Sequence, residues 1–403
     1  MESPCQRVAQ PSLSIAQHAR LLAHLNCNNL MFTMIHAFKR WFKTGVLTLL
    51  LSLMLVGWGA SRPAVAAPVI AALPAGNAIT DGRALLRYAL PIQNDTVRQL
   101  QKVLEDTSTA LRSRKRLSSI NSNLTQADRI LSSKQDQLLA SIAGDRKAEA
   151  GFLIAQMQMG INAMRSAVDE QDKDSIWNKR AELLDLVGAL EELMVETFPY
   201  EVPEEYQNLP QLKGRATVAV ETNKGDLTMV VDGYSAPITA GNFVDLVKRG
   251  FYDGLAFTRQ EDSYVLQIGD PPGDEVGFID PKTKQYRAIP LEVLVKGDTV
   301  PTYGITLEDA GRFLEQPVLP FSSYGALAMA RPGDDVNGGS SQFFFFLFEP
   351  ELTPAGANLL DGRYSVFGYV IEGKEVLEKL RAGDKIISAK VISGEDKLVE
   401  PTA

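Results

Sequence analysis

SSQFFFFLFEP, residues 340–350, places four phenylalanines in a row. Consecutive side chains of a β-strand point to opposite faces, so Phe343 and Phe345 would face one side and Phe344 and Phe346 the other. The run has the length of a strand rather than of a helix. We therefore predict a central strand that is buried on both faces.

The beginning of the chain has the pattern of an export signal. Basic residues at 39–43 precede an apolar run at 45–60, and small residues follow at 64–66. This order is typical of a secretory signal peptide. We therefore expect residues 1–66 to be a leader that is cleaved after export. An uncleaved anchor is the alternative, but the run is shorter than the ~20 residues that a spanning helix needs.

The reactive side chains lie within that leader. All cysteines and histidines precede position 40: Cys5, Cys27, His18, His24 and His36. A mature chain without them has no disulfide, no thiolate nucleophile, no histidine-based triad and none of the usual zinc sites. We expect no metal and no cofactor.

Charge narrows the class of partner. The leader holds six basic residues and one acidic residue, so its removal changes the formal net charge from −8 to −13. An acidic surface repels phosphate backbones, and no Gly-rich phosphate loop follows a strand. We therefore expect neither nucleic acid nor nucleotide as a ligand.

Residues 79–198 carry a helical pattern. The segment is poor in Pro and Gly, and its apolar residues recur at spacings of three and four. We predict an up-and-down, four-helix-like bundle, with one helix at 148–168 and another whose N-cap is Asp174 or Ser175. Methionines at 157–164 indicate either packed core or an adaptable surface for a partner.

The period changes to two after a linker rich in Pro and Glu at 199–213. Alternating residues on both sides of Asn223-Lys224-Gly225 predict a β-hairpin with a three-residue loop. A helix is expected to start at Ala236-Pro237 and to end at Gly250. The second domain is assigned to 214–397.

Five motifs then follow in order: TNKGDLTMVVDGYSAPITAGNFVDLVKRGFYDGLAFTR from Thr222 to Arg259, LQIGDP from Leu266, GALAMAR from Gly325, GSSQFFFFL from Gly339, and LLDGRYSVFGYV from Leu359. In this order they resemble a cyclophilin, a family of peptidyl-prolyl cis-trans isomerases. The resemblance implies a closed eight-stranded antiparallel barrel with capping helices. One face of the four-phenylalanine strand would fill the barrel, and the other would reach the prolyl pocket.

An insertion at about 275–320 resembles that of the multidomain cyclophilins of the thylakoid lumen in chloroplasts and cyanobacteria, which also carry a helical bundle and an export signal. The resemblance implies a lumenal or periplasmic protein that assists the assembly or maintenance of photosystem II. Proline-containing segments, including photosystem II subunits, are the expected partners. Because the linker is short, we expect the bundle to stay within contact distance of the barrel.

Rotation of an X-Pro bond needs no nucleophile. The barrier of about 18–20 kcal/mol comes from amide resonance, so a donor aimed at the twisted nitrogen lowers it. An arginine suits this task because its guanidinium is rigid and always charged. The resemblance assigns the catalytic role to Arg259. It assigns substrate binding to these further positions: Tyr264, Val265, Gln267, Ala330, Gln342, Phe344, Leu359 and Tyr364.

Two departures from the family pattern point to weak activity. Leu359 and Tyr364 stand where active cyclophilins often have Trp and His. Glu261 lies two residues from Arg259, on the same side of an extended segment, and is predicted to pair with it and compete with the substrate. The sequence therefore favours an isomerase assisting exported proteins, and a peptide-binding scaffold on the same fold is the alternative.

Overall fold

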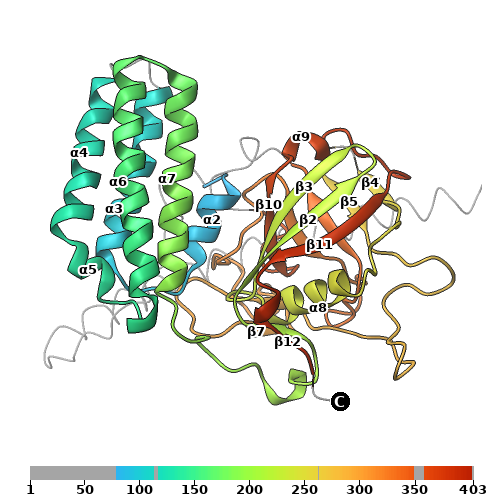
Figure 1. Cartoon of the computed structure of the whole chain (residues 1–403). Helices are drawn as coiled ribbons and strands as arrows, with labels where there is room; N and C mark the ends of the chain where they lie inside the picture. Colours follow the sequence, from blue (N-terminus) through green and yellow to red (C-terminus); the bar gives the residue numbers. More distant parts are fainter. Residues whose placement is uncertain (1–78, 113–116, 262, 349–357, 402–403) are drawn as a thin grey trace, which may run out of the picture. The chain divides into compact units, whose positions relative to one another are not determined.

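A computed structural model describes residues 79–112, 117–261, 263–348 and 358–401 (Figure 1). The predicted leader lies outside these residues. No helix in the described ranges is both long enough and apolar enough to span a bilayer.

Helices form the N-terminal region. Its helices are α2 (Gly82–Ala89), α3 (Asp95–Arg112), α4 (Ser118–Ser133), α5 (Gln135–Leu139), α6 (Lys147–Asp169) and α7 (Lys173–Leu193). The four long helices α3, α4, α6 and α7 share one apolar core, to which each contributes fully buried side chains such as Leu104, Leu124, Ile161 and Leu190. Their apolar residues recur at helical spacing because only one stripe of each helix is buried.

Two details of this region differ from expectation. The N-cap of α7 is Asp172, whose side chain accepts hydrogen bonds from the N–H groups of Asp174 and Ser175. The sequence prediction of Asp174 or Ser175 as the cap is therefore wrong by two or three residues. Of the methionines on α6, Met157 and Met164 are fully buried, whereas Met159 is 64% exposed, so the group divides between core and surface.

The C-terminal region is built on an eight-stranded antiparallel sheet in the order β11-β2-β3-β10-β8-β9-β5-β4. The strands are β2 (Arg215–Thr222), β3 (Gly225–Asp232), β4 (Arg259–Glu261), β5 (Val265–Ile268), β8 (Ala326–Met329), β9 (Phe343–Phe346), β10 (Val366–Glu372) and β11 (Ile386–Ser393). The sheet is curled, with β11 and β4 as its end strands (Figure 1). The sequence analysis predicted that the sheet closes into a barrel, which is more specific than a curled sheet.

The predicted hairpin is present with a shorter loop. Thr222 pairs directly with Gly225, so two residues rather than three connect β2 to β3. Gly225 has a φ of 133°, which a glycine adopts without strain. After β3, helix α8 (Pro237–Lys248) begins with proline in its first turn, and Gly250 follows its end with a φ of 67°. The segment at 199–213 ends in strand β1 (Gln211–Leu212), which pairs with β12 (Leu398–Val399).

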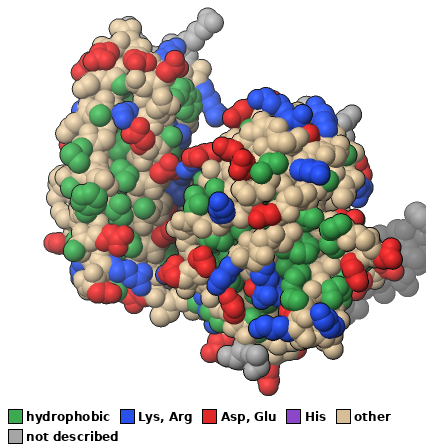
Figure 2. Space-filling view, turned by 45° about the vertical axis from the view of Figure 1, so that its right-hand side comes forward, with side chains coloured by type: hydrophobic (Ala, Val, Ile, Leu, Met, Phe, Trp, Pro, Cys, Tyr) green, Lys and Arg blue, Asp and Glu red, His purple; other side chains and the backbone are tan. Residues whose placement is uncertain are grey.

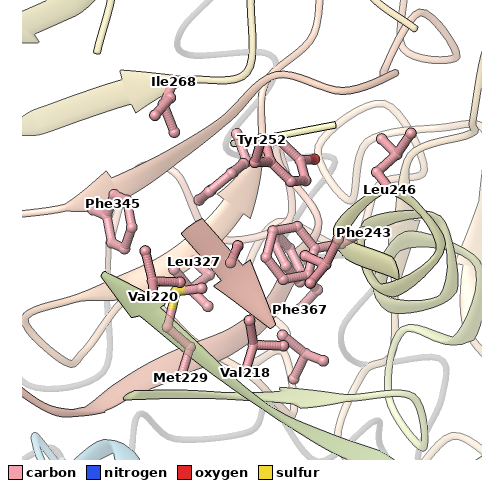
Figure 3. Packing of buried hydrophobic residues seen from close by; sticks show 14 of the residues in the cluster. Val218, Val220, Met229, Phe243, Leu246, Tyr252, Ile268, Leu327, Phe345 and Phe367 are labelled. Carbon is pink, nitrogen blue, oxygen red and sulfur yellow. The ribbon is translucent and has the colours of Figure 1, made fainter. Parts of the chain in front are cut away.

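Strand β9 is buried on both faces, as its four phenylalanines predict. Phe343 and Phe345 belong to the large core that includes α8, whereas Phe344 and Phe346 belong to a separate cluster on the other face. Figure 3 shows the first core from close by, with the ring of Phe243 beside that of Phe367. The two faces of one strand therefore serve two different clusters.

The insertion forms a small lobe of its own. Strands β6 (Glu292–Val293) and β7 (Thr302–Tyr303) pair with each other, and Leu291, Val293, Val295 and Leu307 form a compact apolar cluster. Glu292 is almost completely buried, and its carboxylate accepts hydrogen bonds from the N–H groups of Ile238 and Thr239. The insertion therefore caps the first turn of α8 and is fixed to the sheet region.

Candidate active site

Three predicted site residues form one row across the sheet. Arg259 on β4 lies opposite Gln267 on β5, and Gln267 lies opposite Phe344 on β9. Side chains that oppose one another on neighbouring strands share a face and lie close together. The hydrogen-bonding register of three strands therefore brings a cation, an amide and an aromatic ring to the same face. We call these three residues the site row.

Arg259 is paired with Glu261. Its Nη2 donates to Glu261 Oε1, and the two side chains are 60% and 43% exposed. They lie two residues apart on β4, so both point to the same face of the strand. This is the ion pair that the sequence predicted. Because both groups are solvated, the pair contributes at most about 1 kcal/mol, and a ligand can displace it.

Amide groups extend the polar part of the site. Gln267 Nε2 donates to Gln342 Oε1 at 2.7 Å, and Gln342 Nε2 donates to Asp270 Oδ1 at 3.0 Å and to the Val276 carbonyl at 2.8 Å. The N–H of Ala330 donates to the Gln342 carbonyl at 2.9 Å. These bonds fix the orientation of both glutamines and hold Gln267 beside Arg259.

The apolar part of the site centres on Phe344, which is 5% exposed. Phe321 stacks on it with a ring separation of 6.0 Å and an interplanar angle of 5°, and Tyr364 meets it edge-on at 5.4 Å. Val265 is 7% exposed and belongs to the same cluster. Phe321 was missed by the sequence reasoning, although it lies in the LPFSSYG segment just before the GALAMAR motif.

Of the remaining predicted residues, Tyr264 lies beside this cluster, whereas Leu359 is not part of it. Tyr264 is 36% exposed and meets Phe346 edge-on at 5.7 Å, whereas Leu359 is 86% exposed. The guanidinium of Arg331 lies 5.1 Å from the centre of the Tyr364 ring. The sequence analysis also missed Arg331, because nothing in the GALAMAR motif indicates that its last residue contacts Tyr364.

Burial changes the acid–base behaviour of one carboxylate near the site. Burial raises the pKa of Asp361 to about 6, although the N–H groups of Phe321 and Asn358 donate to it and oppose the rise. Asp361 thereby ties the segment that carries Phe321 to the segment that carries Leu359 and Tyr364. Its role here is to hold two loops together.

This arrangement can bind and twist an amide but offers no nucleophile. An exposed guanidinium and two hydrogen-bonded amides lie beside an aromatic and aliphatic surface, which suits a group that is apolar on one side and polar on the other. No set of three or more His, Cys, Asp or Glu side chains within the described ranges is arranged to hold a metal ion.

Family models match both regions of the chain. Residues 81–195 match the model described as peptidyl-prolyl cis-trans isomerase CYP38-like, PsbQ-like domain. Residues 217–399 match the model described as cyclophilin type peptidyl-prolyl cis-trans isomerase/CLD. The second match contains the whole site row.

Curated relatives are similar over most of their length. A protein of Synechocystis sp. named putative thylakoid lumen peptidyl-prolyl cis-trans isomerase sll0408 is 56% identical over 90% of this chain and 96% of its own. The chloroplastic isomerase CYP38 of Arabidopsis thaliana is 45% identical over 84% of this chain and 80% of its own. The chloroplastic isomerase CYP37 of the same plant is 34% identical over 79% of this chain and 71% of its own.

Proposed function

Because this chain belongs to the cyclophilin-type peptidyl-prolyl cis-trans isomerases, in the group that carries a PsbQ-like helical domain, we propose that it isomerises X-Pro bonds at the site row. The observation that carries the proposal is the register that aligns Arg259, Gln267 and Phe344 across β4, β5 and β9. Each member of the row supplies one property that the reaction needs.

The proposed mechanism divides the work between the two ends of the row. Phe344, with Val265 and Tyr264, holds the proline ring on an apolar surface. Arg259 donates to the proline nitrogen as the bond twists, and so stabilises the twisted amide more than either planar state. Gln267 binds a neighbouring peptide group, because Gln342 fixes its side chain. No cofactor takes part.

A peptide-binding scaffold is the second candidate. The ion pair between Arg259 and Glu261 occupies the donor before any substrate arrives. The side chain of Leu359 is 86% exposed, so it offers little apolar surface that could cover a ligand bound at the site row. Under this alternative the site row binds a proline-containing segment and releases it without accelerating cis-trans isomerisation.

The relatives' names guide a proposal for the location. They place the related proteins in the thylakoid lumen or the chloroplast. With the export signal predicted at 1–66, these names support a lumenal protein, and the periplasm remains the alternative destination. We propose exported and lumenal polypeptides as clients, with photosystem II subunits among them.

Two finer features of the architecture are also proposed. The N–H of Phe257 donates to the Asp384 carbonyl at 2.8 Å, and the N–H of Gly383 donates to the Phe257 carbonyl at 2.8 Å. These bonds lie next to the end strands β4 and β11, and they support closure of the sheet into a barrel. The shared core of α3, α4, α6 and α7 supports an up-and-down four-helix bundle.

We further propose that the helical domain restrains the site through α2. Leu85 and Leu86 belong to the same apolar cluster as Phe344. Weakening this contact with Leu86→Ala should raise affinity for an X-Pro peptide if α2 limits access. Unchanged affinity would show that α2 does not restrain the site.

The main test is exchange spectroscopy by NMR on a short X-Pro peptide with the whole protein. Isomerase activity predicts exchange between the cis and trans signals that disappears with Arg259→Ala and persists with Lys390→Ala. Lys390 is exposed on β11 and serves as the control for loss of one cation. Binding without exchange in the unmodified protein would favour the scaffold.

A further inference from the structure

Exposed apolar side chains are common on this protein, so exposure alone selects no site. On the face shown in Figure 2, small apolar patches are scattered between acidic and basic side chains. One group differs because its members surround a cavity of about 390 Å³: Phe313 and Leu314 from the insertion, and Leu359 from the segment before Tyr364. We call this cavity the insertion cleft.

The side chains at the cleft are unusually exposed for their size. Phe313 is 69% exposed, Leu314 is 59% exposed and Leu359 is 86% exposed. Large apolar side chains are less stable when exposed to water than when buried. Three of them around one cavity form a surface that a ligand would stabilise by covering it.

Polar bonds hold the insertion side of the cleft in place. Arg312, next to Phe313, pairs with Asp298 at 2.8 Å and with Glu315. At the other end, the Gln316 carbonyl accepts from the Lys296 N–H at 2.9 Å and its Oε1 accepts from Lys296 Nζ at 3.2 Å. Phe313 and Leu314 are thus presented on a loop that is fixed at both ends, which lowers the entropy cost of binding a ligand there.

One short segment, residues 358–364, connects the cleft to the site row. Leu359 and Arg363 line the cleft, and Tyr364, which follows directly, contacts Phe344. The wall between the two sites is fixed, because Arg331 donates to the Arg363 carbonyl at 3.0 Å through Nη2 and stacks on Tyr364. A polypeptide whose proline lies on Phe344 therefore passes one segment, residues 358–364, to reach the cleft.

The charges at the rim favour an uncharged occupant. Arg363 is paired with Glu308, and Glu315 is paired with Arg312. Asp361, the remaining acid at the rim, accepts hydrogen bonds from backbone N–H groups. A charged ligand side chain would have to break one of these pairs, whereas an apolar one would cover the exposed carbon atoms without that cost.

We propose that the insertion cleft is a further subsite of the prolyl site, which takes a large apolar side chain of the same polypeptide a few residues from its proline. The proposal rests on the proposed function, since it assumes that the site row binds the proline. It defines the substrate class as proline segments with a nearby aromatic or long aliphatic residue. The cavity is of the size that ligand pockets have.

The test uses the whole protein and a series of X-Pro peptides. Each peptide carries one Phe at a successive position before or after the proline, and a matched peptide carries Ser there. Burial of one Phe side chain should tighten binding about tenfold at one or two positions. The measured quantity is the ratio of the dissociation constants of the Ser and Phe peptides.

Two variants locate the effect. Phe313→Ser should bring that ratio close to one, and because Phe313 is mostly exposed its removal leaves the core intact. Ile392→Ser, which removes a side chain that is 60% exposed on β11, should leave the ratio at about ten. A ratio near one at all positions in the unmodified protein, or a ratio that survives Phe313→Ser, would overturn the proposal.

A third peptide separates this proposal from the function itself. Replacing the proline by Ala in the best Phe peptide should weaken binding about tenfold or more, if both sites act together. Unchanged affinity would show that the cleft is independent of the site row and would overturn the subsite. Failure of the function has a different signature, since the Phe-free X-Pro peptide would then show neither binding nor exchange.

Discussion

The two faces of strand β9 pack against different apolar clusters. Phe343 and Phe345 are completely buried in a core that includes α8 and neighbouring strands. Phe344 and Phe346 face a cluster that Phe321, Val265 and α2 complete. Loop residues contribute to both faces: Tyr252 and Phe257 contact the inner rings, and Phe321 contacts the outer ones. The inner face therefore lies within the main core, whereas the outer face is the one on which we propose that the peptide binds.

The largest expected effect separates the two faces directly. Both Phe343→Ala and Phe344→Ala should lower the free energy of unfolding by about 3–5 kcal/mol, because each removes a buried ring. Only Phe344→Ala should also weaken X-Pro peptide binding to the folded protein. Urea denaturation and peptide titration measure the two quantities. Equal loss of affinity in both variants would break the division between faces.

The next effect concerns Glu292. Its carboxylate accepts hydrogen bonds from the first turn of α8, which packs in the core on the inner face of β9. Burial raises the pKa of Glu292 to about 7 from its ordinary 4.5, against the opposing effect of its hydrogen bonds to Thr239 and Ile238. The native state thus binds this proton more tightly than the unfolded state. The stabilisation is complete below pH 4.5 and is lost as the pH rises through about 7.

The change in pKa corresponds to about 3 kcal/mol at 1.36 kcal/mol per pKa unit. Urea denaturation between pH 4.5 and about pH 8 should show that much more loss of stability in the unmodified protein than in Glu292→Gln. Glu191 in α7, whose pKa burial also raises to about 7, supplies a background slope common to both proteins. Parallel curves would contradict the assignment.

A smaller effect is expected on the outer side, at Gly362. Its φ is 76°, and an added Cβ would lie 2.7 Å from the side chain of Leu307. Gly362→Ala should lower the free energy of unfolding by about 1–2 kcal/mol from the backbone alone, and by more because of this contact. Gly383→Ala is the matched control, since its φ is 92° and nothing lies within 4 Å. Equal losses would show that Leu307 moves away freely.

The smallest effect is expected from the ion pair on β4. Glu261→Gln should free Arg259 and raise the isomerisation rate or peptide affinity about two- to fivefold, as an exposed pair is worth up to about 1 kcal/mol. Glu375→Gln on helix α9 (Lys374–Leu377) removes the same charge elsewhere and should change neither. No gain with Glu261→Gln would show that the pair does not limit the site.

The inner face and the site row could be predicted from the sequence because strand periodicity and register determine them. Four consecutive phenylalanines require two buried faces, and the ordered motifs place Arg259, Gln267 and Phe344. The pairing of Arg259 with Glu261 was also predictable, because it depends only on a spacing of two along one strand.

The contacts made by loop residues near the site were not predictable in the same way. Phe321 reaches Phe344 because Asp361 holds its backbone, and Phe313 is presented because Arg312 is paired with Asp298. These contacts join segments that are distant in the sequence or follow no period. The N-cap of α7 was misplaced for a simpler reason, since several adjacent polar residues can each cap a helix and only the backbone selects among them.

The most direct measurement is a set of NOEs between a bound X-Pro peptide and the whole protein. We expect contacts from the proline ring to the rings of Phe344 and Tyr264, with the proline nitrogen facing the guanidinium of Arg259. Contacts of the proline ring to the insertion cleft alone, or to the exposed face of α6 around Met159, would contradict the claim that the outer face of β9 is the prolyl site.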